Sequence, residues 1–135
     1  MILFPHYVAA SAIEGVGLFT RVALAAGTPL YRCDARFLTV IGDGEIAALP
    51  PAMREAMSKY TYRGRGPHRL QGARYYGLDD SRFMNHSDAP NSRWVAEQEL
   101  YVAACDIPAG SEITCDYREF TEPGDWEQDR FLASA

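Results

Sequence analysis

Short runs in which apolar and polar residues alternate cover most of the chain, and this period of two is typical of half-buried β-strands. Residues 17–40 predict two extended segments on either side of a turn at Ala26 and Gly27. Residues 93–107 alternate around Gln98, which predicts a hairpin. A Pro-Ala-Gly turn then leads into the strand-like segment "SEITCDY". The pattern therefore favours a fold made mainly of short strands.

One stretch has a helical pattern instead. Gly42 and Gly44 end the preceding strand, and residues 45–60 supply good helix formers, with Pro51 suited to a first turn. The acidic tail allows a last helix after Gly124. Because no linker, low-complexity block or repeat array interrupts the chain, we expect one compact, mainly β domain with one or two short helices.

Length and composition limit the class of protein. A chain of 135 residues is long enough to bury a core without metals or disulfides, and 47% hydrophobic and 23% charged residues are ordinary for a globular protein. No apolar run approaches the ~18 residues of a membrane span, and the N-terminal stretch lacks a signal peptide's basic region. The three cysteines form no Cys-x-x-Cys pair, which favours reduced thiols in a cytoplasmic protein. The net charge of −5 argues against a general nucleic-acid binder.

Two motifs in the first two thirds of the chain are candidates for binding a ligand. Gly15-Val16-Gly17 would let backbone groups approach a ligand closely, or would form a plain turn before a strand. Asn85-His86 combines an amide that donates and accepts with an imidazole that can orient a carbonyl group or an adenine edge. A polar turn or a satisfied buried histidine would explain the same pair. A metal site is disfavoured, because the histidine and cysteine spacings match no zinc pattern.

Two further features have simpler alternatives as well. Asp116-Tyr117 follows a predicted strand, where the tyrosine hydroxyl could be hydrated and have no other role. The basic, glycine-rich segment 62–72 carries several arginines. With nearby tyrosines it could bind RNA by base stacking and phosphate contacts. The acidic remainder of the chain favours a solvated loop there.

The order of these motifs is more informative than each motif alone. "GVGLFT", "RFMNHSDAPN" and "GSEITCDY" together resemble the three signatures of SET-domain protein-lysine methyltransferases. The middle motif matches the family pattern R-F-x-N-H-S-x-x-P-N at all seven specified positions. The last matches G-E-E-L-T-x-D-Y at Gly110, Glu112, Thr114, Asp116 and Tyr117, with Ile113 in place of the leucine. The resemblance covers residues 11–117 and leaves a tail, residues 118–135. It implies a single SET domain over residues 1–135.

The resemblance also implies a fold and a chemistry. The fold is the β-clip: small curved sheets, with a C-terminal pseudoknot that brings the Asn-His stretch beside the Asp-Tyr strand. The activity is transfer of a methyl group from S-adenosylmethionine, leaving S-adenosylhomocysteine, to a lysine ε-amine in a protein. Tyr117 is the implied catalytic residue, whose hydroxyl orients the amine and stabilises the methyl group in transfer. The implied cofactor-binding residues are Glu14, Gly15, Val16, Gly17, Arg82, Asn85, His86 and Tyr117.

A narrow aromatic channel would disfavour the lysine ammonium by desolvation and so leave the free amine, which is the nucleophile. Tyr75, Tyr76 and Trp94 are candidates for its wall, and each could equally be a core aromatic. Cys115 stands where many family members have Tyr or Phe, which leaves the number of transferred methyl groups undetermined. Trp126 could cover the adenine by stacking, in place of the zinc-binding cysteines that follow some SET domains, or it could pack a terminal helix.

The charge of the C-terminal part predicts the kind of partner. Residues 112–129 carry seven acidic residues and one arginine, which would attract a basic, lysine-containing protein or peptide rather than nucleic acid or a membrane. A homodimer is left open. The main alternative function is a SET-fold module that binds cofactor or peptide without turnover, which Cys115 leaves open. RNA binding through the arginine-rich segment is a more distant alternative.

Overall fold

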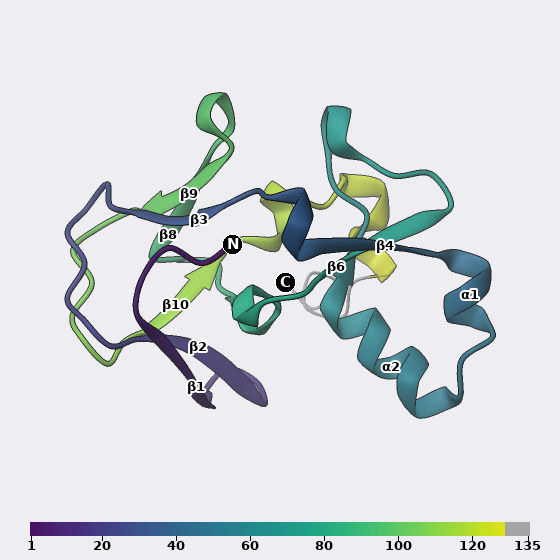
Figure 1. Ribbon diagram of the computed structural model, residues 1–135, viewed down its shortest axis with the longest axis horizontal. Helices are drawn as coiled ribbons and strands as arrows, with labels where there is room; N and C mark the ends of the chain where they lie inside the picture. Colours follow the sequence, from purple (N-terminus) through teal and green to yellow (C-terminus); the bar gives the residue numbers. More distant parts are fainter. Residues whose placement is uncertain (129–135) are drawn as a thin grey trace. The chain divides into compact units, whose positions relative to one another are not determined.

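The computed structural model describes residues 1–128, and the side chains of residues 126–128 lie outside that description. The chain divides into two compact units, each built from two separate segments. Unit 1 comprises Met1–Asp34 and Asp79–Asp116, and unit 2 comprises Ala35–Leu78 and the segment from Tyr117 onward. Figure 1 labels their elements. Short strands in small sheets dominate, with two α-helices, as the sequence pattern predicts.

Unit 1 contains two small sheets. The first has the order β1-β2-β10-β7, and the second has the order β3-β9-β8. In Figure 1, β1 and β2 form a hairpin beside β10. The strands of unit 1 are β1 (His6–Ala10), β2 (Val16–Thr20), β3 (Pro29–Arg32), β7 (Asn85–His86), β8 (Ser92–Val95), β9 (Leu100–Ala103) and β10 (Glu112–Cys115).

The turns of unit 1 confirm two local predictions. Gly27 has φ +84°, in the left-handed region that favours glycine, and it lies in the predicted turn between β2 and β3. The predicted hairpin around Gln98 is β8 and β9, joined by the 3₁₀ turn η4 (Ala96–Gln98). A second 3₁₀ turn, η3 (Asp80–Phe83), precedes β7.

Strand β7 is paired differently from its neighbours. It runs parallel to β10, with Asn85 opposite Thr114 and His86 opposite Cys115, whereas β10 is antiparallel to β2. The Asn-His stretch therefore lies beside the strand that leads to the Asp-Tyr motif, which confirms the predicted proximity of these two distant segments. The threading of a C-terminal segment under a loop remains a prediction.

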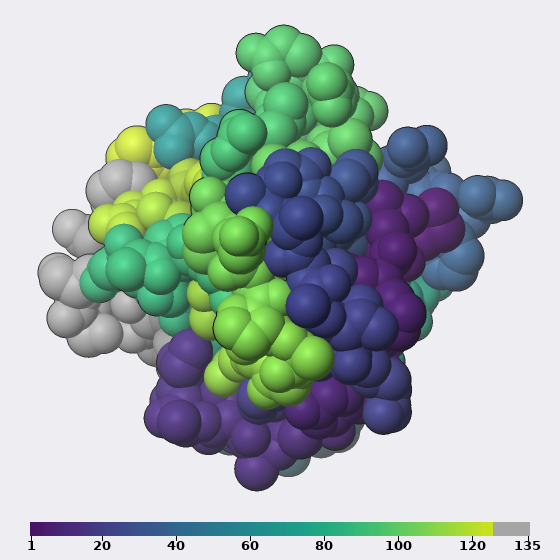
Figure 2. Space-filling view, turned by 90° about the vertical axis from the view of Figure 1, so that its left-hand side faces the viewer, coloured from purple at the N-terminus to yellow at the C-terminus, as the bar shows by residue number. Residues whose placement is uncertain are grey.

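The core of unit 1 lies under these strands. Leu18 on β2 and Ile113 on β10 are register partners, and both are fully buried. Leu24 forms an isolated bridge with Ile107, and both side chains are buried. Figure 2 shows the corresponding blue and light-green segments packed against each other. The core thus fixes the strand β10 on which the C-terminal motif lies.

Unit 2 contains one three-stranded sheet and the two helices. The sheet has the order β4-β6-β5, with β4 (Leu38–Gly42), β5 (Thr61–Tyr62) and β6 (Ala73–Gly77). The helices are α1 (Asp43–Ala47) and α2 (Pro51–Tyr60), and the 3₁₀ turns are η1 (Ala35–Phe37), η2 (Gly66–His68), η5 (Tyr117–Glu119) and η6 (Pro123–Gln128). Among residues 1–128 no helix is long and apolar enough to cross a membrane.

The helices differ from their predictions in extent and in type. The single helix expected over residues 45–60 is divided at Pro50, whose extended backbone (ψ 151°) ends one helix and begins the next. Pro51 occupies the first turn of α2, as predicted. Helix α1 begins earlier than expected because the Glu45 carboxylate accepts the Gly42 N–H at 2.8 Å and caps the helix. The helix expected after Gly124 is the 3₁₀ turn η6.

Candidate functional site

Asn85 connects three segments of unit 1. Its side chain is buried, with only 2% of the residue exposed. The amide nitrogen lies 3.2 Å from the Glu14 carbonyl oxygen, 3.0 Å from that of Val16, 2.8 Å from Glu112 Oε1 and 3.2 Å from Ser11 Oγ. Two amide hydrogens are shared among these four acceptors. Asn85 therefore ties β7 both to the segment around the Gly-x-Gly motif and to β10.

His86 has carboxylates on both sides of its ring. Its Nε2 atom lies 3.2 Å from Asp88 Oδ1, and its Nδ1 atom lies 3.7 Å from Asp116 Oδ1. With Glu112 at Asn85, three carboxylates adjoin the Asn-His pair. Their arrangement makes the surroundings of the pair electronegative. Among the described residues no group of three or more His, Cys, Asp or Glu side chains could hold a metal ion.

Asn91 lies at the end of the middle motif. Its side chain makes the hydrogen bonds to β10 that the backbone of a neighbouring strand would otherwise make. Its Nδ2 atom donates to the Glu112 carbonyl at 2.8 Å, and its Oδ1 atom accepts the Thr114 N–H at 2.9 Å. The neighbouring Ser92 hydroxyl donates to the Thr114 carbonyl at 2.6 Å. Sequence reasoning matched Asn91 to the motif but assigned it no role. A side-chain amide offers the same donor and acceptor as a peptide group, and Asn91 uses both toward β10.

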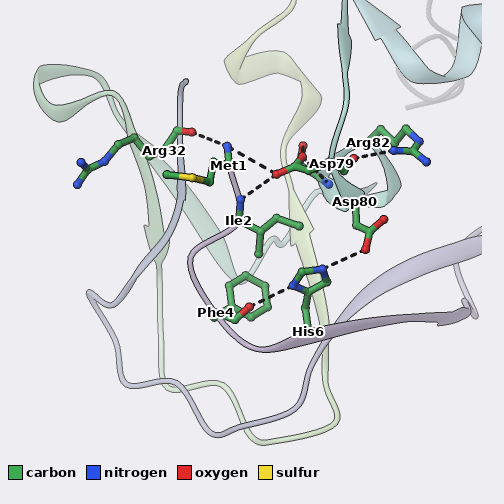
Figure 3. A network of polar contacts seen from close by, with 9 residues as sticks. Met1, Ile2, Phe4, His6, Arg32, Asp79, Asp80 and Arg82 are labelled. Atoms are coloured by element: carbon green, nitrogen blue, oxygen red, sulfur yellow. Dashed lines mark hydrogen bonds and ion pairs between the residues drawn. The ribbon is translucent and has the colours of Figure 1, made fainter. Parts of the chain in front are cut away.

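Arg82, predicted to hold the cofactor, is engaged on its own 3₁₀ turn. Its Nη1 atom donates to the Asp79 carbonyl at 2.8 Å, and its guanidinium carbon lies 4.4 Å from the centre of the Phe83 ring. Figure 3 shows this turn in its polar network. These contacts fix Arg82 three residues before Asn85.

The Asp79 carboxylate anchors the same turn. Its Oδ2 atom accepts the Ile2 N–H at 2.9 Å, and its Oδ1 atom accepts the Ser81 N–H at 3.1 Å, which caps η3 (Figure 3). Burial alone would raise the pKa of Asp79, but hydrogen bonds from Ser81 and Ile2, with the nearby Met1 ammonium, outweigh it and hold the pKa below its ordinary value. The segment that enters β7 is therefore fixed by a charged cap.

Four aromatic rings of unit 2 form a continuous row. Ring centres are 5.3 Å apart for Tyr117 and Phe120, 5.1 Å for Phe120 and Tyr62, and 5.2 Å for Tyr62 and Tyr75. Tyr76 follows Tyr75 on β6, so its side chain points to the opposite face of the sheet. The row thus links Tyr75 to Tyr117 through Tyr62 and Phe120. The sequence analysis did not name Tyr62 or Phe120 as channel residues. Tyr62 is the register partner of Tyr75, so the two side chains lie on the same face of the sheet.

The other predicted channel residues, Trp94 and Cys115, belong to unit 1, and their place in a channel stays a prediction. Trp94 belongs to β8 of unit 1, and its ring centre is 5.1 Å from that of the buried Tyr101 on β9, its register partner. Cys115 is buried on β10, opposite His86. The side chain of Trp126 lies outside the described residues, so its predicted stacking stays a prediction.

The arginine-rich segment and the acidic tail bind one another within unit 2. Arg69 forms an ion pair with Asp125, and its hydrogen bond lowers the pKa of that carboxyl group. The Gly66 N–H donates to Glu122 Oε1 at 2.7 Å, and Arg65 donates to the Arg118 carbonyl at 2.8 Å. These contacts reduce the support for RNA binding through this segment, and they offset part of the tail's acidity.

Comparison with known proteins places these motifs in a family. The SET-domain family model matches residues 15–118. A candidate histone methyltransferase of Plasmodium falciparum has a similar structure, with a TM-score of 0.56 and 20% identity over 86% of this chain and 95% of that one. Two structures of Polycomb Repressive Complex 2 from Chaetomium thermophilum match at TM-scores of 0.56. One is a humanized mutant bound to an inhibitor (20% identity), and the other is an autoinhibited form bound to S-adenosylmethionine (19% identity).

The shares covered differ among these structures. The two matches to the complex span 87% of this chain but only 15% and 16% of the longer chains. At these identities the structural likeness shows the fold, while the family model covers most of the chain and includes all three motifs. The chain belongs to the SET-domain family.

Proposed function

We propose that this protein transfers a methyl group from S-adenosylmethionine to the ε-amine of a lysine in a protein substrate. The observation that carries the proposal is the parallel pairing of β7 with β10. This pairing sets Asn85 and His86 beside the strand that ends at Cys115, two residues before Tyr117. A pairing between segments so distant in sequence has no local cause, and it joins two of the three family motifs.

The polar groups around the Asn-His pair fit a cationic cofactor. S-adenosylmethionine carries a sulfonium and an ammonium group, and the carboxylates of Asp88 and Asp116 adjoin His86. Asn85, His86 and the backbone of residues 14–17 would hold the cofactor. When bound, it supplies an electrophilic methyl group on positively charged sulfur.

The chain's own residues would prepare the amine. A lysine ammonium, with an ordinary pKa near ~10.4, is not a nucleophile until it loses its proton. The aromatic row of Tyr117, Phe120, Tyr62 and Tyr75 offers an apolar surface on which the neutral amine is favoured over the ammonium. We assign Tyr117 as the catalytic residue, whose hydroxyl oxygen accepts a hydrogen bond from the amine and orients its lone pair.

The test compares wild-type protein with Tyr117→Phe, which removes one oxygen and keeps the ring. Methyl transfer from labelled cofactor to purified core histones and to a whole-cell lysate gives the turnover, and calorimetry gives the affinity for S-adenosylmethionine. We expect turnover to fall at least ~100-fold while affinity changes little, because only an interaction of the reacting state is lost. Tyr7→Phe is the matched control, since Tyr7 stacks on Phe19 in unit 1.

Each outcome of this comparison decides between the two functions. Wild-type protein that binds the cofactor but labels neither histones nor any lysate protein would support the binding module instead of the enzyme. Labelling must also be checked at Lys59, the single lysine of the chain, to separate self-methylation from transfer to a substrate. Equal turnover in Tyr117→Phe and wild-type protein would refute the role assigned to Tyr117.

A further inference from the structure

The two glycines of the Gly-x-Gly motif have different reasons to lack a side chain. Gly15 has φ +50°, a conformation in which any side chain is strained. Gly17 has no positive φ, yet a Cβ atom at this position would lie 2.1 Å from Glu112 Oε1 and 2.6 Å from Glu112 Cδ. The space that Gly17 leaves open is therefore filled by the carboxylate of Glu112, a residue of the third motif.

The Glu112 carboxylate makes specific contacts in that space. It accepts the Ser11 hydroxyl at 2.8 and 2.9 Å, and Oε1 accepts the Asn85 amide at 2.8 Å. Gly17, Glu112, Ser11 and Asn85 all belong to unit 1 and come from the three motifs or their flanks. The three motifs thus meet at one carboxylate.

Ser11 passes the effect of this carboxylate to the loop between β1 and β2. Its oxygen accepts the Ile13 N–H at 2.9 Å, and its backbone N–H donates to the Gly15 carbonyl at 2.9 Å, which closes the loop. The Glu14 carbonyl oxygen is held by Asn85 at 3.2 Å. The orientation of this loop's backbone groups therefore depends on a chain of hydrogen bonds that begins at Glu112.

We propose that Glu112 is a positioning residue, and that Gly17 is required as glycine to admit its carboxylate rather than to admit the cofactor. This inference rests on the proposed function, in which the backbone of residues 14–17 holds S-adenosylmethionine. Glu112 acts on the cofactor only through Ser11, Asn85 and the loop. A carboxylate here orients the cofactor-binding loop without touching the reacting atoms.

A double-mutant cycle tests the inference. Gly17→Ala would push aside the end of a flexible side chain, so its main effect is loss of the Glu112 hydrogen bonds and not a rigid clash. We expect Gly17→Ala and Glu112→Ala each to weaken S-adenosylmethionine binding about 5- to 30-fold, since each leaves buried polar groups without a partner. Their combination should be no worse than Glu112→Ala alone within about 2-fold, because the obstacle to the alanine side chain is gone.

The kinetic readout separates positioning from general stability. Both single variants should raise the KM for S-adenosylmethionine and leave kcat largely unchanged, whereas a merely structural role would lower the active fraction without changing that KM. Glu112→Asp shortens the side chain and keeps its charge. It therefore provides a second background in which Gly17→Ala should be tolerated if Glu112→Ala does not fold.

The results also distinguish this inference from the proposed function. Equal losses from Gly17→Ala in the wild-type and Glu112 backgrounds would show that the cofactor itself requires the glycine, and would overturn the inference. If wild-type protein does not bind S-adenosylmethionine, the proposed function fails. The same cycle measured by thermal unfolding would then still decide whether Gly17 and Glu112 are coupled.

Discussion

Replacing Asp79 by asparagine should destabilise unit 1 in a pH-dependent way. The carboxylate is mostly buried, with 21% of the side chain exposed, and it holds the turn before β7 to the N-terminal strand segment (Figure 3). Asparagine keeps one oxygen for the Ser81 N–H. Its NH₂ group would then face the Ile2 N–H, so two donors meet where a donor and an acceptor met.

The size of the effect follows from these contacts. One hydrogen bond to a charged group is lost, worth about 1.5–3 kcal/mol. The 3.8 Å pairing with the Met1 ammonium adds little, since partly exposed pairs contribute ~0.2–1 kcal/mol. We expect a loss of about 2–3 kcal/mol in the free energy of unfolding at neutral pH. For a chain of this length, that corresponds to a fall of roughly 6–12 °C in Tm.

The dependence on pH has a definite sign. Because the folded-state pKa of Asp79 lies below the ordinary value of 3.8, its stabilisation is fully present above that value and is lost as the pH falls through the folded-state pKa. Urea unfolding of wild type and Asp79→Asn at pH values from 7 to 2.5 measures this. The difference between the two proteins should be constant from pH 7 to about 5 and should shrink below pH 4.

Glu55→Gln, on the exposed face of α2, controls for removal of any one carboxylate and should change the stability by less than ~0.5 kcal/mol. A stability difference for Asp79→Asn that stays constant down to pH 2.5 would contradict the pKa argument. A difference below ~0.5 kcal/mol at pH 7 would show that the cap is not stabilising at all.

Variants at two further residues test contacts that sequence reasoning did not foresee. Asn91→Ala should lower the free energy of unfolding by about 2–4 kcal/mol, because it removes the partners of the Glu112 carbonyl and the Thr114 N–H. Asn91→Asp keeps the acceptor for Thr114 but sets a carboxylate oxygen against the Glu112 carbonyl oxygen, so it should cost at least as much in urea unfolding. Asp125→Asn should release the tail from Arg69, giving faster proteolysis and hydrogen exchange after Tyr117 with unchanged exchange in β10. Wild type should show the same release at high salt or as the pH falls below 4, since the pKa of Asp125 is lowered by Arg69.

The sequence was sufficient for those features that depend on local chemistry or on a complete motif. The strand period gave the hairpin around Gln98, and glycine conformational freedom gave the turn at Gly27. The matched motifs predicted that the Asn-His stretch would lie beside the C-terminal strand, which the pairing of Asn85 with Thr114 confirms. No local pattern contains that pairing, so only the resemblance supplied it.

The missed features depend on which distant side chains meet. A Gly-x-Gly motif indicates close approach, but the sequence does not say that a glutamate 95 positions later fills the space at Gly17. Likewise, Tyr75 and Tyr76 are equally plausible as channel residues until the strand register shows that only one shares a face with Tyr62. The local errors were in the helices: the helical stretch of residues 45–60 is broken before Pro51, and the helix expected after Gly124 is a 3₁₀ turn.

The charge distribution changes the argument about the partner. The acidic tail was expected to attract a basic substrate, but unit 2 as a whole has nine basic and eight acidic residues, a formal charge of +1, and Arg69 is bound to the tail at Asp125. Unit 1 has ten acidic and four basic residues, a formal charge of −6. Any attraction for a basic protein therefore arises mainly in the unit that carries Asn85 and His86.

The same charge bears on turnover. Salt screens charges beyond about 8 Å, so the carboxylates that act directly on a bound cofactor are the two beside His86, Asp88 and Asp116. The sulfonium of S-adenosylmethionine is positive, whereas the thioether of S-adenosylhomocysteine is neutral. Under the proposed function these carboxylates stabilise the reactant more than the product, because only the reactant carries the sulfonium charge. An electronegative Asn-His site thus favours cofactor binding before transfer and product release after it.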